Sequence, residues 1–506
     1  MKALCVLYGD RQVTVTFPGV QKTVLLGIEG NERPDLPPDV EVLSRPSWTR
    51  KSMLQELSRL SQGFDLTYFA WADCPLLDAD LAGKMAERHM RYRAEYTYAD
   101  GWPYGFAPEI LSPGTAGILA KLVENDDGPV ERDTLFSVIQ KDINAFDIET
   151  EISPWDLRLY RLTLTADSKR NQLLLSRFKE AGFSSAMDAE KFVSEKPALL
   201  RTLPAFFNIQ VSACCPQSCS LCPWPVCGGE VTSGKDFMPV EAFASLLDKI
   251  EKFAGDAVIS LSLWGELSLH PQHKELIEMV LARPALSLVI ETSGIGWKEG
   301  ELNALEVAAS KAPPRENQAC KAPLSWIVSL DAHDPARYKE VRGAGFSEAQ
   351  ACAKMLLSLF PKDAYVQAVR VKDFEDDIEH FYRYWKENVP QQVLSAGRKD
   401  TSHIIIQKYD DFAGPLPKLQ ATDLSPVKRR PCWHIMRDMN ILLDGTVPCC
   451  REDLEVLKGK GESLGNALTG ELSVIWEKGA ALYNAHCKAE YPNLCERCDE
   501  FYTYNF

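Results

Sequence analysis

The chain has 506 residues, more than a single hydrophobic core supports, so we expect about three or four domains. Its 45% hydrophobic and 25% charged residues are typical of soluble globular proteins, and its formal net charge of -15 argues against a nucleic-acid-binding protein. The sequence has no apolar run of about 18 residues and no signal-peptide pattern, so we expect a cytoplasmic protein with no membrane partner. In that reducing compartment the 15 cysteines predict metal ligands, catalytic groups or buried thiols in preference to disulfides.

The first 150 residues are expected to form an α/β domain. The stretch LTYFAWADCPLLDADLAGKMAERHM begins at Leu66 and contains a strand, an Asp-x-Pro-Leu-Leu turn and a helix, followed by a second strand. This order resembles that of nucleotidyltransferases that activate sugars, and the resemblance implies that Asp73 binds the metal that bridges a triphosphate. However, Gly9, Arg11 and Lys22 lack the spacing of the glycine-rich, basic loop that cradles phosphates in those enzymes. We therefore expect a nucleotidyltransferase-like domain that no longer transfers nucleotides and instead binds a nucleotide-like ligand or presents the substrate.

Residues 151–204 are charged, helical in pattern and interrupted by prolines, which predicts a helical connector. From 205 to 424, short apolar segments rich in β-branched residues alternate with amphipathic stretches such as PVEAFASLLDKIEKFAG. This alternation predicts a parallel sheet of right-handed βαβ units, here a partial (β/α)6 TIM-like barrel with its active site at the C-terminal ends of the strands. The expected strands are residues 206–212, 257–265, 286–294, 324–332, 364–371 and 403–410.

Four cysteines lie within the sequence CCPQSCSLC, residues 214–222, directly after the first expected strand. Counted from Cys215, the spacing is Cys-x3-Cys219-x2-Cys222, whereas counting from Cys214 puts four residues in the first gap. Three thiolates on one tight loop can hold three corners of a cubane iron-sulfur cluster, whose remaining iron then stays open to a small chelating molecule. A structural zinc site and unrelated buried thiols are the alternatives.

This loop resembles the CxxxCxxC loop of the radical S-adenosylmethionine (radical SAM) family, whose open iron takes the amino and carboxyl groups of SAM. After the second strand, LWGELSLHP resembles the family's Gly-Gly-Glu motif, with Trp264 in place of the first glycine. The resemblance implies that Gly265 allows close backbone approach and that Glu266 accepts a hydrogen bond from the SAM ammonium group. The literal Gly-Gly-Glu at 228–230 is discounted because it lies on the cysteine loop.

Two further motifs follow in the family's order. ETSG after the third strand resembles a Thr-Asn-Gly turn, which implies that Thr292 lines the SAM site. SLDAHDPARYKEVRG after the fourth strand resembles a segment with a serine hydroxyl and an Arg-Gly pair, which implies that Ser329 lies near the ribose and methionine carboxylate. Leu221 departs from the family, which usually has an aromatic residue there to pack on adenine, and Trp224 is the candidate substitute.

Residues 425–506 predict a small cysteine-rich domain. CWHIMRDMNILLDGTVPCC predicts a hairpin turning at Asp444-Gly445, and LGNALTGELSVIWEKG and CERC predict a Gly-Asn turn, a helix and a closing cysteine pair. This arrangement resembles the SPASM or twitch extension of radical SAM enzymes, which carries auxiliary iron-sulfur clusters. The resemblance implies one auxiliary 4Fe-4S cluster, with the ligands Cys432, Cys450, Cys495 and Cys498.

Cys449 and Cys487 are alternative candidates for this set of four ligands. In the family pattern the cysteine that ends the hairpin lies six residues after the aspartate, which favours Cys450 over Cys449. Cys487 is the candidate replacement ligand. A zinc ribbon is the alternative, since the same closing CxxC pair can bind zinc.

The three regions together resemble the spirochaete SPASM group of proteins. The resemblance implies a radical SAM enzyme of oxidoreductase type, which cleaves SAM to a 5′-deoxyadenosyl radical and abstracts hydrogen from a peptide or protein. Such an enzyme uses SAM, a SAM-binding 4Fe-4S cluster, the auxiliary 4Fe-4S cluster and an electron donor such as flavodoxin or ferredoxin. Two alternatives remain: radical modification of a sugar nucleotide or other small molecule delivered by the first domain, and a non-catalytic, zinc-stabilised binding protein.

Overall fold

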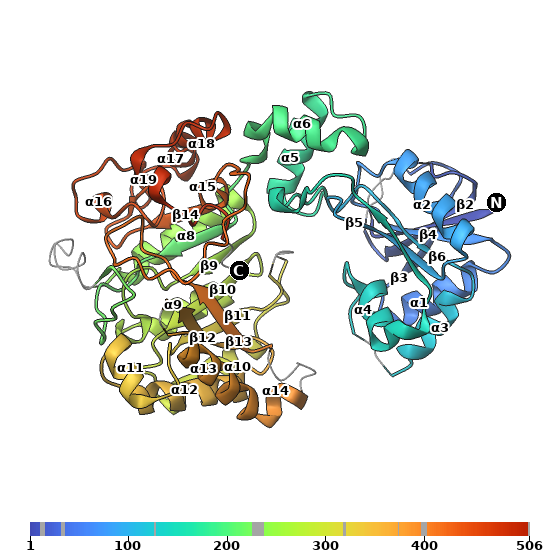
Figure 1. Ribbon diagram of the computed structural model, residues 1–506. Helices are drawn as coiled ribbons and strands as arrows, with labels where there is room; N and C mark the ends of the chain where they lie inside the picture. Colours follow the sequence, from blue (N-terminus) through green and yellow to red (C-terminus); the bar gives the residue numbers. More distant parts are fainter. Residues whose placement is uncertain are drawn as a thin grey trace. The chain divides into compact units, whose positions relative to one another are not determined.

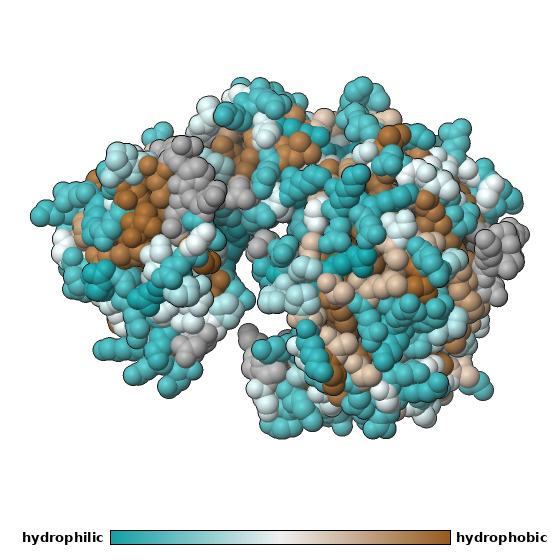
Figure 2. All heavy atoms as spheres, turned by 180° about the vertical axis from the view of Figure 1, so that it is seen from behind, coloured by the Kyte–Doolittle hydropathy of each residue, from teal (hydrophilic) through white to brown (hydrophobic). Residues whose placement is uncertain are grey.

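The structure is a computed structural model that describes residues 1–10, 16–31, 36–125, 128–224, 237–316, 320–372, 374–395 and 402–503. The chain divides into two compact units, Met1–Leu199 and Leu200–Phe506 (Figure 1). Each unit contains a seven-stranded, mainly parallel sheet, so both belong to the predicted α/β class. Hydrophilic residues cover most of the face drawn in Figure 2, and hydrophobic residues gather there in smaller patches. Within the described ranges, no helix is long and apolar enough to cross a membrane.

The sheet of the first unit has the strand order β3-β2-β1-β4-β6-β5-β7. Short β6 runs antiparallel to β4 and β5, and the other pairs are parallel. The strands are β1 Ala3–Tyr8, β2 Val20–Ile28, β3 Val40–Arg45, β4 Leu66–Trp71, β5 Tyr96–Asp100, β6 Glu109–Leu111 and β7 Ile148–Ile152. The helices are α1 Arg50–Leu60, α2 Ala79–Tyr92, α3 Thr115–Leu122, α4 Thr134–Ile139, α5 Lys169–Glu180 and α6 Ala189–Glu195.

The sheet of the second unit has the order β13-β12-β11-β10-β9-β8-β14, and every pair in it is parallel. Its strands are β8 Phe206–Ile209, β9 Ala257–Ser260, β10 Leu286–Thr292, β11 Leu324–Ser329, β12 Ala364–Arg370, β13 Ile404–Lys408 and β14 Asp438–Ile441. The first six lie inside the six predicted segments and follow one another across the sheet in chain order, as in a (β/α) barrel. With β13 and β14 at its edges, the described sheet is not closed.

Helices connect these strands and cover one face of the sheet (Figure 1). They are α8 Val240–Ala254, α9 His273–Leu281, α10 Glu299–Ser310, α11 Pro335–Arg342, α12 Phe346–Leu359, α13 Glu375–Glu387 and α14 Gln391–Ser395. In α8 the buried Phe243, Leu246, Leu247 and Ile250 recur every three or four residues, so they form the apolar stripe that packs on the sheet.

Alternation along the strands gives the sheet a second, barrel-facing side. Leu288 and Ile290 of β10 belong to the large core beneath the helices, whereas Val289 packs in a separate apolar cluster with Phe206, Val258 and Ile327. Because side chains alternate between faces, Glu291 is on the side of Val289, and Thr292 is on the side of Ile290. Glu291 and Thr292, neighbours at the end of β10, therefore lie on opposite faces of the sheet.

The cysteine-rich tail contributes the strand β14 to this sheet, where the sequence predicted only a hairpin. The turn at Asp444-Gly445 is present, with Gly445 at a φ of 88° and the Leu442 amide donating to the Thr446 carbonyl at 2.8 Å. The first arm of the hairpin, Asp438–Ile441, also pairs with Phe206–Ile209 of β8. The predicted Gly-Asn turn is a short strand, β16 Gly465–Asn466, paired with β15 Thr446–Val447 and followed by the turn.

Candidate functional site

The cysteine loop leaves the C-terminal end of β8 and is described over residues 210–224, whereas the discounted Gly-Gly-Glu at 228–230 lies outside the described residues. Cys215 is exposed, and Cys219 and Cys222 are half-buried free thiols. Burial, together with the nearby charges of Cys219 and Cys215, raises the pKa of Cys222 to about 12. Although Cys215 is exposed as a residue, desolvation of its sulfur atom raises the pKa of Cys215 to about 11. The three thiols are thus close enough to oppose one another's ionisation, and a bound cation would favour their thiolate forms.

Polar contacts with the segment after β11 hold the cysteine loop in place. The Gln217 amide donates to the Tyr338 hydroxyl at 2.7 Å and accepts from Arg342 Nε at 3.1 Å. Arg342 is ion-paired with buried Asp331 at 2.5 Å. Burial raises the pKa of Cys219, and the positive charge of Arg342 opposes that rise. Arg342 of the predicted Arg-Gly segment therefore acts directly on the cysteine loop.

Gly265 brings the loop after β9 against the cysteine loop. Its φ is +134°, and a Cβ atom there would lie 2.0 Å from the Ser212 carbonyl oxygen. The next amide, that of Glu266, donates to the Cys214 carbonyl at 2.7 Å. The predicted close backbone approach at Gly265 is therefore an approach to the cysteine loop.

The Glu266 carboxylate is buried and joins the ends of β9 and β10. It accepts from the Thr292 hydroxyl at 2.6 Å and from the Ser293 amide at 2.7 Å. The Trp297 indole donates to the same Thr292 hydroxyl at 2.9 Å. Burial raises the pKa of Glu266, and its charge contributes to the raised pKa of Cys215. Glu266 and Thr292 therefore lie together beside the cysteine loop.

Ser329 lies in a different polar group, on the barrel-facing side of the sheet. Its hydroxyl donates to Glu291 at 2.7 Å, and the Gln367 amide donates to the same carboxylate oxygen at 2.8 Å. The structure therefore separates the predicted SAM contacts into two groups, Ser329 in one and Gly265, Glu266 and Thr292 in the other. Sequence reasoning missed Glu291 and Gln367, although polar residues at the ends of apolar strands were a usable signal.

The two residues considered for an adenine contact are both packed. Leu221 contacts the apolar cluster of Val371, Tyr409 and Leu416. Trp224 is 7% exposed, and its indole donates to the Ala213 carbonyl at 3.1 Å. Trp224 therefore stabilises the cysteine loop.

The four tail cysteines predicted as ligands line one cavity, which we call the tail cavity. Burial raises the pKa of Cys432 to about 12 and that of Cys495 to about 11, and it also raises that of Cys498. Other residues lining the cavity are Arg429, His434, Ile435, Arg451, Glu452, His486, Leu494, Glu500 and Phe501. A site in which four thiols meet suits either an iron-sulfur cluster or zinc.

The two further tail cysteines are placed differently. Cys449 lies near the group, since a hydrogen bond to it, burial and its charge raise the pKa of Cys450. Its thiol also contacts Asp453 at 3.2 Å. Cys487, the last residue of α18 Ala480–Cys487, is not among the described residues that line the tail cavity. Of the two, Cys449 is the nearer to the predicted ligands.

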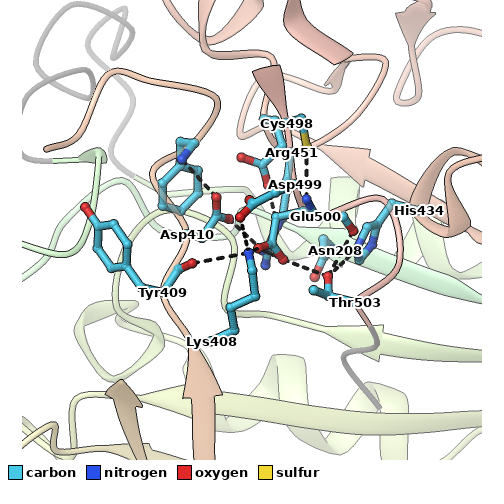
Figure 3. A network of polar contacts seen from close by, with 12 residues as sticks. Asn208, Lys408, Tyr409, Asp410, His434, Arg451, Cys498, Asp499, Glu500 and Thr503 are labelled. Carbon is cyan, nitrogen blue, oxygen red and sulfur yellow. Dashed lines mark hydrogen bonds and ion pairs between the residues drawn. The ribbon is translucent and has the colours of Figure 1, made fainter. Parts of the chain in front are cut away.

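A charge network forms part of the lining of the tail cavity and extends from it (Figure 3). Arg451 pairs with Asp410 and with Glu452, each at 2.9 Å, and Lys408 pairs with Asp499 at 2.9 Å and with Glu500. The carboxylates of Asp410, Asp499 and Glu500 lie close enough to hold a metal ion, but each already forms an ion pair with Lys408 or Arg451. Sequence reasoning missed this network because its members are up to about ninety residues apart.

An apolar cluster joins the cysteine loop to the tail. Trp264 and Trp224 pack there with Leu454 and Leu457 of α16 Leu454–Leu457, and Cys222 borders the same cluster. The Phe412 ring lies 5.4 Å from that of Trp264 and 5.9 Å from Arg451 Cζ. Trp264 therefore packs between the cysteine loop and α16 of the tail.

In the first unit, the predicted phosphate and metal ligands are engaged with protein side chains. Asp73, two residues after β4, accepts from Arg132 at 2.6 and 3.1 Å. Lys22 is paired with Glu41 of β3 at 2.6 Å. Arg11 lies outside the described residues.

Replacing Gly265 with alanine should lower the free energy of unfolding by at least about 2 kcal/mol, because the positive φ and the contact with the Ser212 carbonyl both disfavour a Cβ. Urea unfolding of anaerobically purified protein would measure the change. Gly459→Ala is a matched control, since its φ is +70° but a Cβ there meets open space. Equal losses from the two substitutions would contradict the close approach.

No family model matches the sequence. Three solved structures resemble parts of the chain. Streptococcus suis SuiB bound to its precursor peptide SuiA is 15% identical, with a TM-score of 0.41 over 62% of this chain and 75% of that chain. BtrN in complex with AdoMet and 2-DOIA is 15% identical, with a TM-score of 0.36 over 59% and 94%. A cytidylyltransferase from Leptospira borgpetersenii is 16% identical, with a TM-score of 0.32 over 39% and 96%.

A closer similarity is found with an uncharacterized protein of Treponema pallidum. The two sequences are 36% identical over 379 residues, which is 74% of this chain and 98% of that protein. The chain therefore belongs to the same protein family as this Treponema pallidum protein.

Proposed function

We propose that the protein is a radical SAM enzyme that reductively cleaves SAM and abstracts hydrogen from a substrate. The observation that carries the proposal is the joint position of the Cys215, Cys219 and Cys222 thiols on one loop at the C-terminal end of a parallel strand. Glu266 lies next to these thiols and the loop is pinned by Arg342 and Gln217. Enzymes built on such sheets bind their substrates at this end of the strands.

The residues present fit a SAM-binding 4Fe-4S cluster. Three thiols from one loop would hold three irons, and the raised thiol pKa values mean that a positively charged group must be bound for all three to ionise. When bound, this cluster supplies the electron that cleaves SAM to methionine and a 5′-deoxyadenosyl radical. Arg342, buried and close to Cys219, would offset part of the negative charge of the thiolates.

The surrounding side chains would orient SAM. An ionised carboxylate has about four acceptor positions, and the hydrogen bonds from Thr292, Ser293 and Ser268 use three of those on Glu266. Glu266 can therefore also accept from the SAM ammonium group. Ser329 and Glu291 offer a hydroxyl and a carboxylate to the hydroxyl groups of a bound nucleoside. The apolar side chains of Val289 and Ile327, on the same face, would keep water from the reacting atoms.

We assign the tail cavity to one auxiliary 4Fe-4S cluster held by Cys432, Cys450, Cys495 and Cys498. Four cysteine ligands would leave no iron open, so the role proposed is to accept the electron that remains on the substrate after a hydrogen atom is removed. In this proposal the radical SAM core spans residues 205–424 and the auxiliary-cluster domain spans residues 425–506. Both cofactors favour a cytoplasmic setting and a flavodoxin or ferredoxin as reductant.

The proposed substrate is a peptide or protein, the class that the family resemblance implies. A sugar nucleotide or other small molecule delivered by the first unit is the second candidate. Comparing the peptides and metabolites of cells with and without the protein by mass spectrometry would identify the substrate. A change confined to nucleotide-linked metabolites would overturn the peptide assignment.

Anaerobic reconstitution with iron and sulfide tests the function itself. The reduced protein should convert SAM to 5′-deoxyadenosine and methionine, which chromatography detects. A non-catalytic zinc protein would instead be colourless, would bind zinc at both cysteine sites and would release no 5′-deoxyadenosine.

Glu266→Gln should weaken SAM binding about tenfold to a hundredfold, because one charge-assisted hydrogen bond contributes about 1.5 to 3 kcal/mol. The visible spectrum should not change, since Glu266 would contact SAM and not iron. Equilibrium binding of SAM to the reconstituted protein measures the effect, with Glu275→Gln on the exposed side of α9 as the control. Unchanged affinity, or loss of iron from the Glu266 variant, would contradict this role.

A further inference from the structure

The first unit contains a guanidinium nitrogen placed between two carboxylates. Arg132 Nη2 lies 2.6 Å from Asp73 Oδ2 and 2.7 Å from Asp167 Oδ2. Arg132 Nη1 lies 3.1 Å from the second oxygen of Asp73, so the Asp73 contact is bidentate. These distances place a single positively charged nitrogen at the point where a divalent cation bridging the two carboxylates would sit.

The location is one where α/β sheets bind ligands. Asp73 follows β4, and β4 is paired with β1, whose other neighbour is β2. Successive connections leave the sheet in opposite directions at this point, and the crevice at the carboxyl ends of such strands is the usual ligand site. Asp73 and Asp167 therefore occupy a position suited to a metal-bound nucleotide.

The cluster is fixed by further contacts. Asp167 accepts from the Thr165 hydroxyl at 2.7 Å and from the Asn171 amide at 2.9 Å. The Ala166 amide donates to the Asp73 carbonyl at 2.7 Å, which ties the segment of Asp167 to the β4 loop. Arg132 also stacks on the Trp71 ring, with Cζ 4.7 Å from the centroid. The guanidinium is thus held in one position by hydrogen bonds and by ring stacking.

We propose that Arg132 is a built-in cation that replaces a divalent metal ion in the crevice of the first unit. Hard divalent cations need oxygen ligands at about 2.0 to 2.6 Å, and the guanidinium fills that space. The cluster of one guanidinium and two carboxylates carries one net negative charge, which disfavours a triphosphate. The expected metal role of Asp73 is therefore wrong for the native protein, and the first unit binds no metal-nucleotide complex at this site.

The proposal predicts that a metal site appears when Arg132 is removed. Arg132→Ala would leave the carboxylates of Asp73 and Asp167 facing each other, with the contacts of Thr165 and Asn171 to Asp167 still in place. A divalent cation would relieve the repulsion between the two carboxylates. The probe is Mn²⁺, added to the full-length protein and followed through the loss of its free-ion electron paramagnetic resonance signal. We expect about one additional Mn²⁺ per chain in Arg132→Ala, and none in the double variant Arg132→Ala/Asp167→Asn.

A second variant, Asp73→Asn, provides a test that does not depend on the folding of Arg132→Ala. This substitution should not change the Mn²⁺ binding of the wild-type protein, because Asp73 already has a cation. Loss of a bound Mn²⁺ in Asp73→Asn would overturn the proposal, as would an Arg132→Ala protein with wild-type circular dichroism and no additional Mn²⁺. Neither readout uses SAM or iron, so this proposal and the proposed radical chemistry can fail separately.

Discussion

Cys215→Ala is expected to abolish conversion of SAM to 5′-deoxyadenosine, whereas Cys214→Ala should retain most of it. A methyl group cannot replace a thiolate on an iron corner, and the two remaining thiols of the loop would not hold a cubane cluster. The structure gives Cys214 a different role, because its carbonyl oxygen accepts from the Glu266 amide at 2.7 Å. Alanine preserves that backbone contact, so the loop should keep its position in the Cys214 variant.

The measurement is 5′-deoxyadenosine formed by dithionite-reduced protein, with bound iron determined in parallel. Cys215→Ala should also lose about four irons, the content of one cubane cluster. An active Cys215 variant together with an inactive Cys214 variant would mean that the ligand register is shifted by one residue. Normal activity in both would place the chemistry elsewhere in the chain.

Local sequence pattern was enough to predict six of the seven strands in the sheet of the second unit, β8 to β13. The predicted segments are rich in β-branched apolar residues and most are separated by amphipathic stretches, and both features depend on neighbours in sequence. The strand β14 was missed because Asp438–Ile441 reads as the arm of a hairpin and becomes part of the sheet only through pairing with Phe206–Ile209. Pairing between segments more than two hundred residues apart leaves no local signal.

In the candidate sites, too, the features that depend on local sequence were predicted and the contacts between distant segments were not. Cysteines spaced along one loop or paired in CERC are recognised from spacing alone, and the four tail cysteines do line one cavity. The charged residues around these sites come from distant parts of the chain. Arg342, for example, opposes the rise in the pKa of Cys219, and Arg451 pairs with Asp410. The expectation for Asp73 took no account of Arg132 and Asp167 for the same reason, since these residues follow 59 and 94 residues later in the chain.

The contacts between the two cysteine sites indicate how they would work together. Trp264 packs with Leu454 and Leu457, and its ring also lies against that of Phe412. The guanidinium of Arg451 lies over the Phe412 ring. These residues are buried or half-buried, so they would hold both sites at a constant separation. A constant separation suits transfer of a single electron between the substrate and the auxiliary cluster.

Replacing Cys432, Cys450, Cys495 and Cys498 together with alanine should lower the iron content of the reconstituted protein from about eight atoms to about four. The four thiols line one cavity, so removing them takes away every predicted ligand of the auxiliary cluster and leaves the cysteine loop unchanged. Some SAM cleavage should therefore remain, while turnover of the substrate should be lost.

Cys487→Ala is the matched control, because this half-buried thiol packs in the apolar cluster of Cys432 and Cys450 but is not among the described residues lining the cavity. Iron content that stays at about eight in the quadruple variant would remove the tail from the cluster assignment, and a loss of about four irons in Cys487→Ala would show that the ligand set is wrong.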